Sequence, residues 1–129
     1  MINILIVGDE PIVQKGLHLR LEAEADFRVI GDATNWRSAL EQTIRFNPDV
    51  VIVDIDMRQL DGLELANALN RQCPQTAVIL LSLQDDVHTC TRANQVGAAA
   101  FVVKSMPANT LLTAIRRVAR RVSRNAIEK

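Results

Sequence analysis

Short apolar runs of strand length alternate along this chain with segments in which apolar residues recur at helical spacing. This alternation is typical of an α/β domain, in which parallel strands form a doubly wound sheet with helices on both faces. The apolar runs predict five strands, at residues 2–7, 27–33, 50–54, 77–82 and 100–104.

Helical periodicity predicts one helix after each strand. The second helix should stop before Pro48 and the third near Pro74, because a proline disfavours helical backbone in the residue before it. Gly97 suits the end of the fourth helix, and Pro107 suits the start of the fifth. The apolar residues that mark the helices are Ile12, Leu17, Leu19 and Leu21, then Leu40 and Ile44, then Leu63, Leu65, Ala66 and Leu69, then the more polar stretch 87–96, and finally Leu111, Leu112, Ile115, Val118, Ala119 and Val122.

The chain has the length of one domain. Its 129 residues, 48% of them hydrophobic, are enough to bury a single core. We expect the domain to span residues 1–122, with the polar stretch 123–129 as the start of a linker or tail. No apolar run approaches the roughly 20 residues of a membrane span, and the N-terminus lacks the regions of a secretory signal. These features predict a cytoplasmic protein without membrane contact.

Acidic and basic residues balance at fifteen each, but they are distributed unevenly. Residues 1–62 carry eleven acids against six bases, whereas residues 104–129 carry seven bases against Glu128 alone. The basic flank of the last helix is interpreted as a solvated surface, as a dimer contact with the acidic half of a second copy, or as a basic lead into a following domain. The 3% aromatic content and the lack of a recognition-helix pattern argue against nucleic-acid binding by this chain itself. The basic flank consists of Arg116, Arg117, Arg120, Arg121 and Arg124.

Polar residues stand where four of the apolar runs end: Asp9, Asp54, Ser82 and Lys104. Because crossovers between parallel strands are right-handed, these strand ends should face the same side of the sheet, where open α/β sheets bind ligands. Two neighbouring carboxylates repel each other unless a cation lies between them, and oxygen ligands favour Mg²⁺. The pattern therefore predicts a magnesium site at this edge.

The same four residues suit the capture of a phosphoryl group. Asp54 is the natural nucleophile, since a carboxylate can attack phosphorus and form an acyl phosphate. Lys104 would pair with one phosphoryl oxygen, and the Ser82 hydroxyl would donate to another. Taken singly, each residue is equally well explained as a helix cap. All four together favour the functional interpretation.

The sequence resembles the receiver domain of bacterial two-component response regulators over residues 2–122. In style it is similar to receivers that precede a helix-turn-helix DNA-binding domain. The resemblance implies a flavodoxin-like fold, with a five-stranded parallel sheet in the order 2-1-3-4-5. The matching segments are LIVGDEPIV at 5–13, PDVVIVDIDMRQLDG at 48–62, VILLS at 78–82 and GAAAFVVK at 97–104.

The resemblance implies a role for each residue of the site. Asp54 would be the phosphoacceptor, and Mg²⁺ would be held by Asp9, Asp54 and the backbone carbonyl of Asp56. Ser82 and Lys104 would sense the phosphoryl group, and Phe101 would be the switch aromatic that turns inward on activation. An ordinary core phenylalanine is an equally good interpretation of Phe101.

Several positions depart from the family pattern. Gly8 replaces the first residue of an acidic pair that helps to hold the hydration shell of the metal, and such a loss lowers metal affinity by about 10- to 100-fold. Asp56 or Glu10 could restore part of that charge, or both could be solvated loop acids. Leu83 follows the switch hydroxyl where a small residue is usual, so we expect it to crowd the entrance to Asp54. Arg58, with Gln59, stands in place of the usual Pro-Gly, which predicts a differently shaped loop.

The leading hypothesis for function is a phosphorylation-controlled receiver, which is a switch and not an enzyme. It would accept a phosphoryl group on Asp54 from a sensor histidine kinase and control an output domain, with transcription as the expected output. Homodimerisation is compatible with the basic flank, and DNA contact would come only through an output domain absent from this chain.

Two alternatives stay open. A degenerate receiver, made possible by Gly8, would work through protein–protein contacts without phosphorylation. A small aspartate-dependent phosphatase would use Asp54 and Asp56 as the DxD motif of haloacid-dehalogenase-like hydrolases. Against the phosphatase, the DxD strand of those enzymes comes first in the chain and a pair of metal-binding acids follows the lysine, whereas only Glu128 follows Lys104 here.

Overall fold

The computed structural model describes residues 1–56, 61–83 and 87–128, and within these the side chains of all residues but Ala108 and 121–128. Five parallel strands form one sheet in the order β2-β1-β3-β4-β5. The predicted α/β class and strand order are confirmed. The strands are β1 (Ile2–Val7), β2 (Phe27–Ala33), β3 (Val50–Asp54), β4 (Ala77–Ser82) and β5 (Ala100–Val103).

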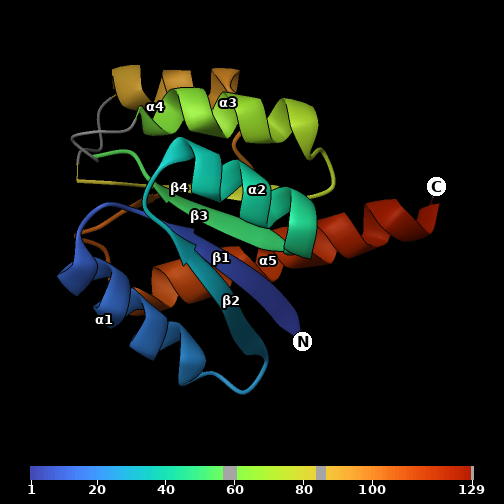
Figure 1. Ribbon diagram of the computed structural model, residues 1–129, viewed down its shortest axis with the longest axis horizontal. Helices are drawn as coiled ribbons and strands as arrows, with labels where there is room; N and C mark the ends of the chain where they lie inside the picture. Colours follow the sequence, from blue (N-terminus) through green and yellow to red (C-terminus); the bar gives the residue numbers. More distant parts are fainter. Residues whose placement is uncertain (57–60, 84–86, 129) are drawn as a thin grey trace.

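Helices cover both faces of the sheet (Figure 1). α2, α3 and α4 lie on one face, and α1 and α5 lie on the other. No helix in the described part of the chain is long and apolar enough to cross a membrane. The helices are α1 (Pro11–Glu22), α2 (Trp36–Phe46), α3 (Gly62–Gln72), α4 (Val87–Gln95) and α5 (Ala108–Glu128).

Each face of the sheet has its own apolar core, because successive side chains of a strand point to opposite faces. In β3, Val51 and Val53 pack under α2 and α3, whereas Val50 and Ile52 pack against α1 and α5. Strands buried on both faces read as continuous apolar runs, which is the pattern that identified them in the sequence.

Most predicted element boundaries agree with the structure. Asn47, with φ 47°, ends α2, and Gly97, with φ 81°, follows α4. α5 continues through residues 123–128, the stretch expected to begin a linker or tail, so the backbone there is helical. The domain boundary at residue 122 stays a prediction.

Not all apolar residues of α1 face the core. Leu21 is buried, but Ile12 is 87% exposed and Leu19 is also largely exposed. Periodicity therefore identified the helix correctly without identifying which of its apolar residues enter the core.

A close approach fixes the connection between β3 and α3. Gly62 opens α3 directly beside the backbone that follows β3, and a Cβ atom on Gly62 would lie only 2.8 Å from the Cα atom of Ile55. Asp61 caps α3 by accepting hydrogen bonds from the Leu63 and Glu64 amides, both at 3.1 Å. Glycine is therefore required here for space, and this packing sets where the residues after Asp54 run.

Candidate functional site

The predicted site residues stand at the carboxyl ends of adjacent parallel strands. Asp54 ends the central strand β3 and pairs in register with Leu81 of β4. Ser82 ends β4 and is buried, and its carbonyl accepts a hydrogen bond of 2.7 Å from the Lys104 amide after β5. Asp9 follows β1 and is partly buried. The sheet thus brings all four strand-end residues to one edge, as parallel topology requires.

Lys104 joins the two carboxylates that follow β3. Its Nζ atom lies 2.8 Å from Oδ2 of Asp54 and 3.1 Å from Oδ2 of Asp56. The side chains are 21% exposed for Lys104, 13% for Asp54 and 27% for Asp56. These ion pairs are partly shielded from water, so their Coulomb attraction is stronger than that of a surface pair.

The pKa of Lys104 reflects two opposing effects. Desolvation lowers the pKa of its ammonium group, but the hydrogen bonds and charges of Asp54 and Asp56 outweigh this and raise the pKa above its ordinary value. Lys104 therefore carries a full positive charge at neutral pH. An ammonium group held beside a carboxylate is suited to bind the oxygens of a phosphoryl group that joins that carboxylate.

Asp56 is more than a solvated loop acid. Its backbone N–H donates to Oδ1 of Asp54 at 2.9 Å, and its own Oδ2 accepts a hydrogen bond of 2.7 Å from the Leu83 amide. One side chain after β3 thus contacts residues after β4 and β5 at once. From the sequence, Asp56 was expected to offer its backbone carbonyl to a metal and to replace part of the negative charge missing at Gly8. Its hydrogen bond with Leu83 joins residues 27 positions apart, and no linear pattern reveals such a contact.

The expectation that Leu83 crowds the entrance to Asp54 is not supported by its contacts. The Leu83 side chain is 66% exposed, and it is the main-chain N–H of this residue that contacts the site. Arg58 and Gln59 lie outside the described residues. Phe101 is partly buried and packs against the core under α2, α3 and α4, so it combines features of both interpretations of this residue.

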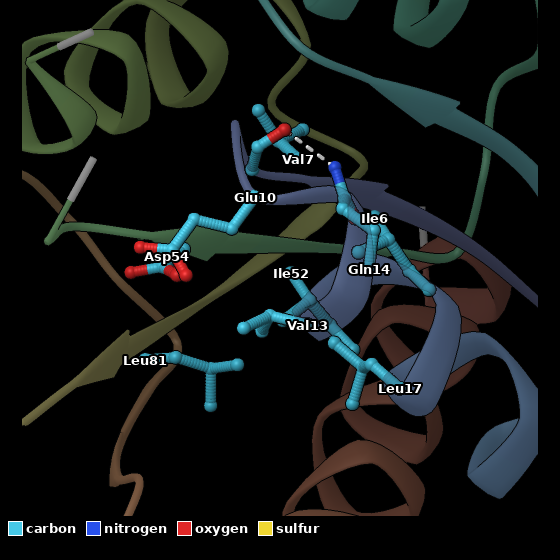
Figure 2. A pocket seen from close by; sticks show the side chains of 10 residues that line it. Ile6, Val7, Glu10, Val13, Gln14, Leu17, Ile52, Asp54 and Leu81 are labelled. Atoms are coloured by element: carbon cyan, nitrogen blue, oxygen red, sulfur yellow. Dashed lines mark hydrogen bonds between the residues drawn. The ribbon is translucent and has the colours of Figure 1, made fainter. Parts of the chain in front are cut away.

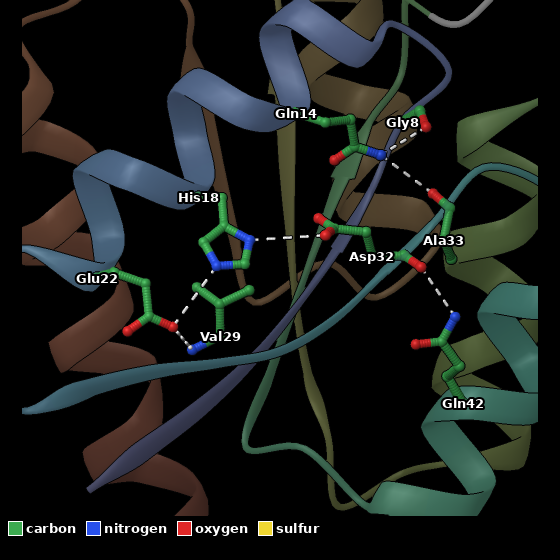
Figure 3. A network of polar contacts seen from close by, with 8 residues as sticks. All are labelled: Gly8, Gln14, His18, Glu22, Val29, Asp32, Ala33 and Gln42. Carbon is green, nitrogen blue, oxygen red and sulfur yellow. Dashed lines mark hydrogen bonds and ion pairs between the residues drawn. The ribbon is translucent and has the colours of Figure 1, made fainter.

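Gln14 is a member of the site that the sequence did not indicate. This buried side chain comes from α1, and its Nε2 atom donates to the carbonyl oxygens of Gly8 (2.6 Å) and Ala33 (3.2 Å) (Figure 3). It thereby fastens α1 to the ends of β1 and β2. Its amide also packs where a side chain on Gly8 would begin, since a Cβ atom there would lie 3.4 Å from Cδ and Nε2 of Gln14. The available signal in the sequence was its spacing, because Gln14 lies three and seven residues before Leu17 and Leu21 and therefore falls on the apolar face of the helix.

A second contact between α1 and β2 involves His18. Its imidazole lies 3.6 Å from Oδ2 of Asp32 and 3.7 Å from Oε1 of Glu22, which also accepts from the Val29 amide (Figure 3). These groups are substantially exposed, so they contribute little to stability.

Glu10 extends from the start of α1 toward the Asp54 carboxylate (Figure 2). It is the N-cap residue of α1, yet its side chain makes no capping hydrogen bond. Glu10, Gly8, Gln14 and Asp54 line one small cavity of ≈ 10 Å³, which is room for about one water molecule. Glu10 is therefore better placed than a random loop acid to add negative charge beside Asp54.

The donor set can be tested for its fit to Mg²⁺. Within the described residues, no three carboxylate, imidazole or thiol side chains gather closely enough to hold an ion. The oxygen chemistry nevertheless suits a hard cation. A Cβ atom on Gly8 would lie 3.7 Å from Cβ of Asp54, and the buried Oε1 of Gln14 has no hydrogen-bond partner among the described residues. The absent side chain at Gly8 thus leaves space beside Asp54, and the carboxylate and carbonyl oxygens present there suit Mg²⁺ with less negative charge than a three-acid site.

Comparison with known proteins gives a consistent result. Residues 4–116 match the response regulator receiver domain family. The transcriptional regulatory protein DegU of Brevibacillus brevis is 32% identical over 118 residues, which are 92% of this chain and 50% of DegU. The chain spans about half the length of the curated relatives it matches.

Two solved structures share the fold closely. The receiver domain of the putative response regulator NarL from Mycobacterium tuberculosis matches with a TM-score of 0.85 at 28% identity, covering 92% of this chain and 96% of that one. The BeF3-activated N-terminal receiver domain of RstA from Klebsiella pneumoniae matches with a TM-score of 0.82, also at 28% identity, covering 92% and 98%.

Proposed function

This chain belongs to the response regulator receiver domain family, and on that premise we propose that it is a switch in which Asp54 accepts a phosphoryl group from the phosphohistidine of a sensor kinase. The observation that carries the proposal is the Lys104 ammonium, 2.8 Å from Oδ2 of Asp54 at the carboxyl edge of the sheet. A carboxylate held beside a fixed cation is suited to take up and stabilise a dianionic group.

The transfer itself is an in-line displacement at phosphorus. An oxygen of the Asp54 carboxylate forms the new bond to phosphorus while the bond from phosphorus to the histidine nitrogen breaks. The phosphohistidine carries a proton on its other ring nitrogen, so the ring departs as neutral imidazole and Asp54 becomes an acyl phosphate. Lys104 then pairs with the phosphoryl oxygens, and the Ser82 hydroxyl donates to one of them, which biases an existing equilibrium between two conformations. Phe101 is the side chain that would follow Ser82.

Receiver domains generally bind Mg²⁺ at their acidic pocket. In this chain Asp9, Asp54 and the backbone carbonyl of Asp56 would hold the ion, which when bound neutralises charge on the phosphoryl oxygens. Gly8 and Gln14 leave this side of the pocket with fewer acids, so we propose a lower Mg²⁺ affinity than in receivers with an acidic pair. Glu10 restores part of the missing charge.

Partners and output follow from the family and its relatives. We propose a cytoplasmic sensor histidine kinase module as phosphodonor and transcription as the output, because the relatives include transcriptional regulatory proteins about twice as long as this chain. DNA contact belongs to an output domain. Arg116, one of the arginines of the basic flank, is engaged within this chain by Glu24 and Asp26, which leaves the exposed Arg117 and Arg120 for a homodimer contact.

The test is direct detection of the acyl phosphate. The protein is incubated with Mg²⁺ and a small phosphodonor, and intact-mass and peptide spectra should show one added phosphoryl group on Asp54. The Asp54→Asn variant should show none. Asp49→Asn, an acid at the opposite end of the same strand, should behave as wild type. Modification of any other residue, or none at saturating donor and Mg²⁺, contradicts the proposal.

The degenerate receiver remains a second candidate, and the observation that favours it is the absence of a three-acid cluster among the described residues. It predicts no adduct at Asp54 and no spectral response to beryllofluoride with Mg²⁺. The phosphatase alternative is weaker, because the Asp56 carboxylate that would act as its acid is occupied by Lys104 and the Leu83 amide. That alternative requires turnover of a chromogenic phosphate ester that Asp56→Asn abolishes.

A further inference from the structure

The Asp56 carboxylate connects three strand ends through two charged hydrogen bonds. Oδ2 of Asp56 accepts from the Leu83 amide at 2.7 Å and lies 3.1 Å from Nζ of Lys104. Leu83 is the residue directly after the buried switch hydroxyl of Ser82. The position of the backbone at Ser82 and Leu83 is therefore tied to the charge state and partners of a side chain that follows β3.

Lys104 is shared between two acids. In the resting structure it contacts Oδ2 of Asp54 and Oδ2 of Asp56 together. A phosphoryl group on Asp54 would present more negative charge to Lys104 than the carboxylate did, and so would draw the ammonium away from Asp56. The Leu83 amide would then be the remaining partner of Asp56 among the contacts seen here.

We propose that Asp56 is a positioning residue that latches Leu83, and with it Ser82, in the resting conformation, and that it competes with Asp54 for Lys104. This inference rests on the proposed function, since it describes the resting side of that switch. When Lys104 moves to the phosphoryl group, Asp56 loses the ion pair that holds its carboxylate in place. The Leu83 backbone that Asp56 holds is then free to shift, and Ser82 can move toward the phosphoryl group. The side-chain carboxylate of Asp56 thus sets how readily the domain leaves its resting state, and it does so through Lys104 and the Leu83 amide.

The chain offers a matched control on the same strand. At the other end of β3, Oδ2 of Asp49 accepts a hydrogen bond of 2.8 Å from the Asn3 amide, which repeats the chemistry of the Asp56–Leu83 contact away from the cleft. Variants at Asp49 therefore report the loss of a carboxylate–amide bond as such. Variants at Asp56 report that loss together with any effect on the switch.

Two variants separate the latch from a simple charge effect. Asp56→Asn removes the charge but keeps an oxygen that can accept from the Leu83 amide, whereas Asp56→Ala removes both. Amide hydrogen exchange at Leu83, measured by NMR in the unmodified protein, should be about 10-fold faster in Asp56→Ala and only slightly faster in Asp56→Asn. In Asp49→Ala exchange should speed up at Asn3 and stay unchanged at Leu83.

The second readout is activation by beryllofluoride with Mg²⁺, followed through chemical shifts of Ser82 and Leu83. Removing the latch destabilises the resting state, so less beryllofluoride should be needed for half-maximal activation. We expect that beryllofluoride concentration to be at least about 3-fold lower in Asp56→Ala than in Asp56→Asn. Equal half-saturating beryllofluoride concentrations in the two variants would mean that only the charge of Asp56 matters, and would overturn the latch. Unchanged Leu83 exchange in Asp56→Ala would overturn it as well.

Failure of the proposed function has a different signature. If wild type does not respond to beryllofluoride and takes up no phosphoryl group, the switch proposal fails and the role of the latch fails with it. If wild type responds normally but the two Asp56 variants match Asp49→Ala, only the latch fails.

Discussion

The two ends of the sheet use the same groups to opposite effect. At the amino end two arginines serve the two acids before β2: Arg116 donates to both Glu24 and Asp26, and Arg20 lies 3.6 Å from Glu24. The Arg116 guanidinium also lies 4.7 Å from the ring centre of Phe27, and Asp49 accepts from the Asn3 amide. At the carboxyl end one lysine serves two carboxylates. The amino end is satisfied within the chain, whereas the carboxyl end keeps an excess of negative charge that a bound cation would relieve.

Burial follows the same division. Near the amino end, the buried Thr76 hydroxyl donates to the Pro48 carbonyl at 3.0 Å, so its polar group is accounted for. Near the carboxyl end, the buried Oε1 of Gln14 has no partner within the part of the chain that the structure describes, and Gly8 leaves space between Gln14 and Asp54. Buried polar groups are nearly always hydrogen-bonded, so the unpaired Gln14 oxygen is an exception that sets the carboxyl end apart.

Removing the shared cation, Lys104, should have the largest effect on the function of the carboxyl end. Lys104→Ala leaves Asp54 and Asp56 facing each other and removes the group that would bind the phosphoryl oxygens. We expect the rate of phosphoryl uptake from a small donor to fall about 10- to 100-fold, which is the range for a hydrogen bond to a charged group. Intact-mass time courses measure it. The control Arg71→Ala removes an exposed cation in the last turn of α3 and should leave the rate unchanged.

Adding an acid at Gly8 should sharpen the contrast between the ends. The space at Gly8 admits a Cβ atom at ordinary contact distances, so Gly8→Asp should fold and should raise Mg²⁺ affinity by about 10-fold or more. Titration calorimetry measures the dissociation constant. Gln75→Asp places the same charge on an exposed residue before β4, at the other end of the sheet, and should change nothing. Equal affinities in all three proteins would show that the Gly8 position does not limit metal binding.

Two glycines test how closely the backbone is packed at the carboxyl end of the sheet. Gly62→Ala forces a Cβ atom against the Ile55 backbone and should lower the free energy of unfolding by about 1–3 kcal/mol. Gly16 lies in an exposed turn of α1, where an added Cβ atom would meet no described atom within 4 Å outside its own helix backbone and chain neighbours. Gly16→Ala should therefore raise the free energy of unfolding by about 0.5–1 kcal/mol. Urea unfolding measures both. Equal effects would contradict the close approach of α3 to the end of β3.

The amino end should respond to pH in a direction set by Asp26. The hydrogen bond from Arg116 is the largest cause that holds the pKa of Asp26 below its ordinary value of 3.8. Its contribution to stability is therefore present above pH 3.8 and lost as the pH falls below that value. Arg116→Ala should flatten this acid-side loss in urea midpoints and leave the response to beryllofluoride unchanged. A variant that keeps the full acid-side slope would contradict the assignment.

Much of the fold could be predicted from the chain because burial on both faces leaves a direct signature. The run from Val50 to Val53 reads as a strand without any knowledge of its neighbours. Asp54 and Lys104 were expected at one edge because parallel topology sends every strand end there. Ile12 and Leu19 show the limit of such patterns, because an exposed apolar residue on a helix looks the same in sequence as a buried one.

The sequence by itself determined which strands form, in what class of sheet, and which polar residues reach the functional edge, because these depend on the order and period of apolar residues. Only the tertiary structure decided that Asp56 holds both Lys104 and the Leu83 amide, that Gln14 packs beside Gly8, and that Arg116 is bound within the chain. Each of these contacts joins residues from different elements through one hydrogen-bonded atom. Such a contact depends on distances of a fraction of an ångström, which no periodic pattern encodes.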